Sequence, residues 1–131
     1  MKIGIIGAGQ IGGTLTRRLT KLRHTVFVAN SRGPETLAEL AKETGAKAVP
    51  VKDAVRGVDL VVVTIPEKNI PQLPPGLFDG VPADVVVVDT GNYYPQQRDG
   101  RIAAIEAGMT ESGWVAQQLG RPVVKAFRSV P

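Results

Sequence analysis

The apolar residues of this chain fall into continuous runs and into stripes at helical spacing. Val- and Ile-rich runs predict buried strands at Lys2–Ile6, Asp59–Ile65 and Asp84–Val88. Strands that are apolar on both faces are typical of a parallel sheet covered by helices on both sides. Three further strands are predicted from shorter runs: Thr25–Ala29, Lys47–Val49 and Val123–Phe127.

Helical spacing appears between these runs. From Gln10 to Leu22 the apolar residues lie four, four and three positions apart, which predicts an amphipathic helix. Pro34 is a favourable first helical residue, and the apolar stripe after it ends near Gly45, which predicts a second helix. The remaining segments are expected to be a short helix over Glu111–Leu119, turns and loop through the proline-rich residues 66–83, and irregular chain over 92–110.

The alternation of strands and helices predicts an α/β fold, a doubly wound and mostly parallel sheet with strand order 3-2-1-4-5-6. At 131 residues the chain is expected to form one domain, 1–131. It has no cysteine and only one histidine, His24, so we expect neither disulfides nor a metal site. The apolar runs are too short for a membrane span, and no cationic-then-apolar leader follows Met1, so a cytoplasmic protein is expected.

A glycine-rich turn follows the first predicted strand. Gly7 permits a tight turn, Gly9 has no side chain to hold a pyrophosphate away, and Gly12 lets the helix pack closely on the sheet. The helix N-terminus would present free N–H groups to phosphates. This strand–turn–helix context predicts a Rossmann-like dinucleotide site with six cofactor-binding residues: Gly7, Ala8, Gly9, Gln10, Ile11 and Gly12.

The second predicted strand ends in Asn30, Ser31 and Arg32. A site for NAD should have Asp or Glu here to accept hydrogen bonds from the ribose hydroxyls. A carboxylate would repel the 2′-phosphate of NADP, whereas a hydroxyl and a guanidinium donate to it. These three residues therefore predict NADP(H) as the cofactor. The alternative is that Arg32 only points into solvent from a loop.

Further candidates follow the later strands. Thr64, Ile65 and Pro66 follow the fourth strand, at the carboxyl end of the sheet beside its switch point, where we expect ribose and nicotinamide. Asn92 follows the fifth strand; it either reaches the nicotinamide or belongs to an Asx turn. No Ser-His-Asp set or carboxylate pair stands out, so no catalytic residue is predicted. Hydride transfer between stacked cofactors needs proximity and orientation instead.

The net charge of +4 favours an anionic partner. The basic residues are scattered and only six aromatic residues are present, which argues against a nucleic-acid surface. A small phosphate-bearing ligand fits this composition better, with no nucleic acid and no membrane as partners.

Five segments together resemble a known family: "MKIGIIGAGQIGGTLTRRL", "VANSRGPETLAEL", "VDLVVVTIP", "VVVVDTGNYYP" and "RPVVKAF". They are similar to the NADPH-dependent reductases of the deazaflavin coenzyme F420, the F420-dependent NADP oxidoreductases. The resemblance implies NADP over the glycine turn with Ser31 and Arg32 on its 2′-phosphate. It also implies a second cofactor stacked on the nicotinamide and a direct hydride transfer, with Ile65, Pro66 and Asn92 near that junction.

Two departures from the family keep other functions open. Arg128 stands where the family has Asn, and family members continue past the last strand with a smaller part that closes the pocket. The main hypothesis is an NADPH-dependent oxidoreductase with a flavin or coenzyme F420 as second substrate. The alternatives are a non-catalytic NADP(H)-binding module lacking the C-terminal lobe, and a reductase of a small imine or keto acid. The predicted sixth strand would lie exposed at the edge of the sheet and could pair with another copy of the chain, so a homo-oligomer is expected.

Overall fold

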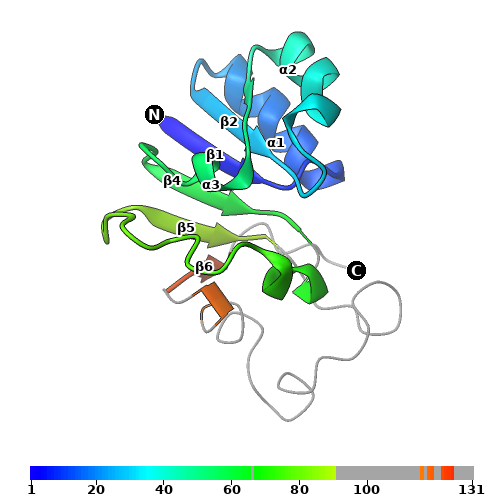
Figure 1. Cartoon of the computed structure of the whole chain (residues 1–131). Coiled ribbons are helices and arrows are strands. Elements are labelled where there is room, and N and C mark those ends of the chain that lie inside the picture. Colours follow the sequence, from blue (N-terminus) through cyan, green and yellow to red (C-terminus); the bar gives the residue numbers. More distant parts are fainter. Residues whose placement is uncertain (66, 91–115, 117, 120–121, 126–131) are drawn as a thin grey trace.

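A parallel six-stranded sheet in the order β3-β2-β1-β4-β5-β6 forms the centre of the protein (Figure 1). The computed structural model describes residues 1–65, 67–90, 116, 118–119 and 122–125. This order is the one predicted, and it makes β1 and β4 the central pair, where the direction of winding reverses. The strands are β1 (Lys2–Ile6), β2 (Thr25–Ala29), β3 (Lys47–Ala48), β4 (Leu60–Val63), β5 (Val86–Asp89) and β6 (Val124–Lys125).

Successive strand residues feed two cores on opposite faces of the sheet. On β1, Ile5 belongs to one cluster and Ile6 to the other, as expected for a strand buried on both faces. Helices α1 (Gln10–Lys21) and α2 (Ala38–Thr44) supply apolar side chains to the Ile5 cluster. Helix α3 (Val51–Ala54) and the 3-10 helix η2 (Glu67–Gln72) cover the Ile6 cluster (Figure 1). The predicted double winding is confirmed.

Several element boundaries differ from the predicted ones. The predicted helix after Pro34 is divided into a 3-10 turn, η1 (Pro34–Leu37), and α2, which Gly45 ends with φ 83°. Strand β5 begins later than predicted because the N–H of Val85 closes a turn onto the carbonyl of Pro82. The four-residue helix α3 was not predicted, since one helical turn is too short to show a periodic pattern.

Much of the last third of the chain lies outside the described residues. Of the predicted helix over Glu111–Leu119, residues 116, 118 and 119 are described and are helical. Strand β6 lies within the predicted Val123–Phe127 and pairs with the end of β5. Pro66, Asn92 and Arg128 fall outside the described residues. No helix among the described residues is long and apolar enough to cross a membrane.

Candidate functional site

The glycine turn between β1 and α1 is fixed by conformation and by space. Gly7 has φ 109°, which favours glycine, and its N–H donates to the carbonyl of Ala29 at 2.7 Å. A Cβ at residue 7 would lie 2.5 Å from Thr64 Oγ1 and 2.9 Å from Ile65 Cγ2. Residue 7 must therefore be glycine for two reasons: its backbone has a positive φ, and the residues that follow β4 leave no space for a side chain.

The first turn of α1 rests directly on this glycine turn. A Cβ on Gly12 would collide with the carbonyl oxygen of Gly7 and lie 2.7 Å from Thr64 Oγ1. Gly9, the N-cap of α1, makes no side-chain cap, and the first turn contains no acidic residue. A Cβ on Gly9 would meet nothing within 4 Å. The free N–H groups and partial positive charge of the helix end thus face open space that suits an anion.

The carboxyl edge of the sheet is held by two threonines that follow β4 and β5. The N–H of Thr64 donates to the carbonyl of Ile6 at 2.8 Å, and its hydroxyl lies 3.1 Å from the carbonyl oxygens of both Ile6 and Gly7. Thr90 repeats the arrangement, with its N–H and hydroxyl 3.0 and 3.2 Å from the carbonyl of Val63. Thr64 thus supports the glycine turn, while its predicted ribose contact stays a prediction.

The loop after β2 is organised by the side chain of Asn30. Its Oδ1 accepts hydrogen bonds from the backbone N–H of Arg32 at 3.1 Å and of Gly33 at 3.0 Å. Its Nδ2 donates to the Thr36 hydroxyl at 2.9 Å, and that hydroxyl lies 2.7 Å from the Gly33 carbonyl. A carboxylate could not make the donor contact. Ser31 and Arg32 are left exposed at the tip of an ordered loop.

The glycine turn and this loop border one cavity of about 540 Å³. Eight of the predicted site residues line it: Gly7, Ala8, Gly9, Asn30, Ser31, Arg32, Thr64 and Ile65. Ile11 and Gly12 do not line it; Gly12 is buried beneath the turn, and Ile11 is partly exposed on α1. Gln10 is the first residue of α1.

Six polar or glycine positions of the cavity were not predicted: Gly13, Arg17, Thr36, Glu39, Glu43 and Asn69. Gly13 and Arg17 follow Gly9 by four and eight residues, a helical spacing that places all three on one side of α1. That spacing was the available signal. The α2 residues carried no such signal, because their position depends on how the two helices pack.

A second, more apolar cavity of about 350 Å³ adjoins the first. The two share Asn30, Ser31, Ile65 and Asn69 among their lining residues. The rest of the second lining is largely proline and aliphatic side chains, among them Pro34, Val51, Leu73 and Pro74. A polar region beside an apolar recess is the arrangement expected for a ligand that carries both phosphates and a planar base.

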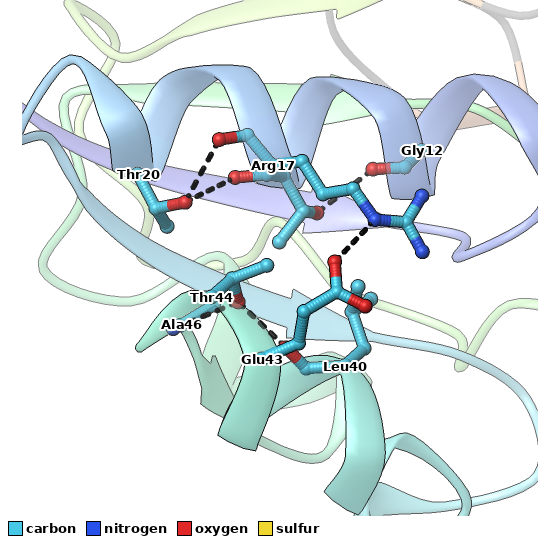
Figure 2. A network of polar contacts seen from close by, with 8 residues as sticks. Gly12, Arg17, Thr20, Leu40, Glu43, Thr44 and Ala46 are labelled. Carbon is cyan, nitrogen blue, oxygen red and sulfur yellow. Dashed lines mark hydrogen bonds and ion pairs between the residues drawn. The ribbon is translucent and has the colours of Figure 1, made fainter.

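Two arginines and two glutamates line the larger cavity. Arg17 Nε lies 2.6 Å from Glu43 Oε2, an ion pair between α1 and α2 (Figure 2). The Arg32 guanidinium, by contrast, makes no hydrogen bond or ion pair within the part of the chain that the structure describes. Its charge is thus available to a ligand.

A doubly wound parallel sheet with a glycine turn at its switch point, and a helix N-terminus facing a cavity there, defines a Rossmann-type dinucleotide-binding fold. Residues 2–93 match the family described as NADP oxidoreductase, coenzyme F420-dependent, and the chain belongs to this family. The resemblance inferred from the sequence is therefore confirmed.

Solved structures of similar proteins share the fold. A hypothetical protein of Sinorhizobium meliloti is 31% identical, with a TM-score of 0.79, and the match covers 100% of this chain and 63% of that protein. A candidate F420-dependent NADP reductase of Arthrobacter sp. FB24 is 18% identical, with a TM-score of 0.73, over 100% of this chain and 64% of that one. An imine reductase of Pseudomonas sp. is 19% identical, with a TM-score of 0.58, over 95% and 40%. The chain thus spans less than two thirds of the length of each.

Proposed function

We propose that this chain binds NADP(H) and transfers hydride between its nicotinamide and a flavin-like acceptor such as coenzyme F420. Membership of a family of NADP oxidoreductases supports the dinucleotide, and the name of that family supports the acceptor. The observation that carries the choice of NADP over NAD concerns Arg32, which is exposed and lines the cavity. Its guanidinium makes no hydrogen bond or ion pair with any residue that the structure describes.

Two properties suit Arg32 to binding a phosphate: it lines the cavity, and its guanidinium has no partner among the described residues. Asn30 fixes the backbone at Arg32 and Gly33, and therefore fixes the position from which the Arg32 side chain extends. Ser31 beside it offers a hydroxyl, and no carboxylate ends β2. A guanidinium donates two parallel hydrogen bonds to a phosphate and is not deprotonated at neutral pH. Both residues would thus hold the 2′-phosphate.

The other described residues fit the rest of the cofactor. The free N–H groups at the start of α1 and the open space over Gly9 suit a pyrophosphate. The apolar recess bordered by Pro34 and Leu73 suits the adenine ring. Ile65, at the end of β4, together with Pro66 and Asn92, is our proposal for the nicotinamide end.

The proposed reaction demands little acid–base chemistry of the protein. Bound NADPH supplies a hydride, and the protein binds both rings, orients them and excludes water. The described part of the cavity contains carboxylates and guanidinium groups but no histidine or cysteine. We therefore assign no catalytic residue.

The proposal is tested first by binding. Calorimetry with the full chain should show tighter binding of NADPH than of NADH. Arg32→Ala should weaken NADPH binding at least about tenfold, as loss of a charge-assisted hydrogen bond implies, and leave NADH binding unchanged. Arg18→Ala, which removes a cation from an exposed α1 position outside the cavity, is the matched control. Equal losses of NADPH and NADH binding in Arg32→Ala would exclude the 2′-phosphate contact.

The acceptor is tested by absorbance. The protein with NADPH should bleach oxidised coenzyme F420, with FMN and FAD as comparison acceptors. NADPH binding without reduction of any of the three would contradict the enzymatic half of the proposal and leave a dinucleotide-binding module.

A further inference from the structure

The end of the second turn of α1 brings a second guanidinium, that of Arg17, to the cavity that Arg32 lines. Arg17 lines this cavity together with Ser31 and Arg32, although it lies far from the loop in sequence. It belongs to neither the glycine pattern nor the residues that follow β2. We propose that Arg17 is a specificity-determining residue: its terminal guanidinium nitrogens bind the 2′-phosphate together with Arg32. This inference rests on the proposed NADP(H) binding and adds a residue to it.

The Arg17 side chain is oriented by its contact with Glu43 and lies close to Gly13. Glu43 on α2 accepts from Nε at 2.6 Å, and among the described residues the terminal nitrogens have no hydrogen-bond partner, so they can bind another anion. Figure 2 shows these nitrogens at the far end of the guanidinium, beyond the Nε that bonds Glu43. Nη1 lies 3.4 Å from the position that a Cβ on Gly13 would occupy. The guanidinium thus lies beside Gly13, which also lines the cavity.

Guanidinium chemistry allows both contacts at once. The group has five N–H donors in one plane, so the Nε edge can bond a carboxylate while the terminal nitrogens bond a phosphate. The Arg17 and Glu43 side chains are 54% and 55% exposed, so their ion pair contributes little to stability by itself. The negative charges of Glu39 and Glu43 offset the positive charges of the two arginines that line the cavity. A dianionic phosphate would therefore need both cations to bind well.

Three variants distinguish a contact between Arg17 and the 2′-phosphate from an ion pair that only connects α1 and α2. Arg17→Gln should weaken NADPH binding about tenfold in calorimetry, with NADH binding unchanged within about twofold. Glu43→Gln also breaks the ion pair but keeps the cation and removes a negative charge, so NADPH binding should be unchanged or tighter. Arg18→Gln makes the same charge change as Arg17→Gln on α1 but outside the cavity, and should have no effect.

Each other outcome has a defined meaning. Equal weakening by Arg17→Gln and Glu43→Gln would show that the pair acts only between the helices and would overturn the inference. Equal loss of NADPH and NADH in Arg17→Gln would move the contact to the pyrophosphate and would also overturn it. Unchanged NADPH binding in Arg17→Gln, while Arg32→Ala loses it, would refute the role of Arg17 alone. A wild-type chain that binds neither dinucleotide would refute the proposed function itself.

Discussion

The two sides of the cavity are built by different means. The glycine turn is held by backbone contacts: Gly7 and Gly12 are buried, and any Cβ there would collide with neighbouring atoms. The loop after β2 is held by one side chain, Asn30, and leaves Ser31 and Arg32 exposed. Substitution of Gly7 or Gly12, on the steric side, should therefore destabilise the fold, whereas substitution of the exposed Ser31 or Arg32, on the side-chain side, should leave the fold intact.

The largest expected effect separates two adjacent glycines. Gly12→Ala should lower the free energy of unfolding by about 3 kcal/mol, because its Cβ would collide with the Gly7 carbonyl rather than with a movable side chain. Gly13→Ala is the matched control. Its Cβ would lie 3.4 Å from Arg17 Nη1 and 3.7 Å from the Ala8 carbonyl oxygen, which are ordinary contacts. Because alanine has a higher helix propensity than glycine, Gly13→Ala should raise the free energy of unfolding by up to about 1 kcal/mol.

Urea denaturation of the two variants measures this difference. A similar loss in both would show that close packing of α1 on the turn is not the reason for Gly12. The larger effect at residue 12 would confirm that the turn is set by backbone contacts.

A smaller effect is expected on the loop side. Asn30→Asp keeps an oxygen for the N–H groups of Arg32 and Gly33 but loses the donor to the Thr36 hydroxyl. It also places a negative charge beside the proposed 2′-phosphate site. NADPH binding should therefore weaken about tenfold, NADH binding should hold or improve, and the free energy of unfolding should change by about 1 kcal/mol or less.

Calorimetry with both dinucleotides and urea denaturation test this prediction together. Asn30→Ala, which removes both the acceptor and the donor, is the comparison: it should disorder the loop without adding charge. If Asn30→Asp weakens both dinucleotides equally, the charge at residue 30 does not choose between them.

The sequence predicted the steric side of the cavity better than the side-chain side. Strand order and glycine turn depend on hydrophobic runs and on a local pattern, both of which are readable along the chain. The sequence showed that Asn30 stands where an NAD site would have a carboxylate, but it did not show that the Asn30 side chain organises the loop. That role depends on the position of Thr36 within η1, which a sequence pattern does not show.

Arg17 and Glu43 show the same limit at longer range. They are 26 residues apart and meet only because α1 packs against α2. Gly9, Gly13 and Arg17 share a helical spacing that could have indicated the α1 member, but nothing indicated its partner. The proposed contacts of Pro66 and Asn92 stay predictions, because both lie outside the described residues.

The smallest expected effect tests whether the turn needs its hydroxyl support. Thr64→Val keeps the side-chain shape and the N–H bond to Ile6 but removes the hydroxyl contacts with the carbonyls of Ile6 and Gly7. It should cost about 1 kcal/mol of unfolding free energy. Thr90→Val removes the equivalent hydroxyl bond to Val63 and should cost about as much.

Binding distinguishes the two threonines. Of the two threonines, Thr64 contacts the glycine turn and Thr90 does not. Thr64→Val should therefore weaken NADPH and NADH binding alike, by about two- to threefold, which is less than the loss of one whole hydrogen bond would cause, and Thr90→Val should leave both unchanged. A loss confined to NADPH would mean that the Thr64 hydroxyl contacts the 2′-phosphate, the group in which the two dinucleotides differ. No loss in Thr64→Val would mean that Gly7 and Gly12 hold the turn by packing alone, which would sharpen the contrast between the two sides of the cavity.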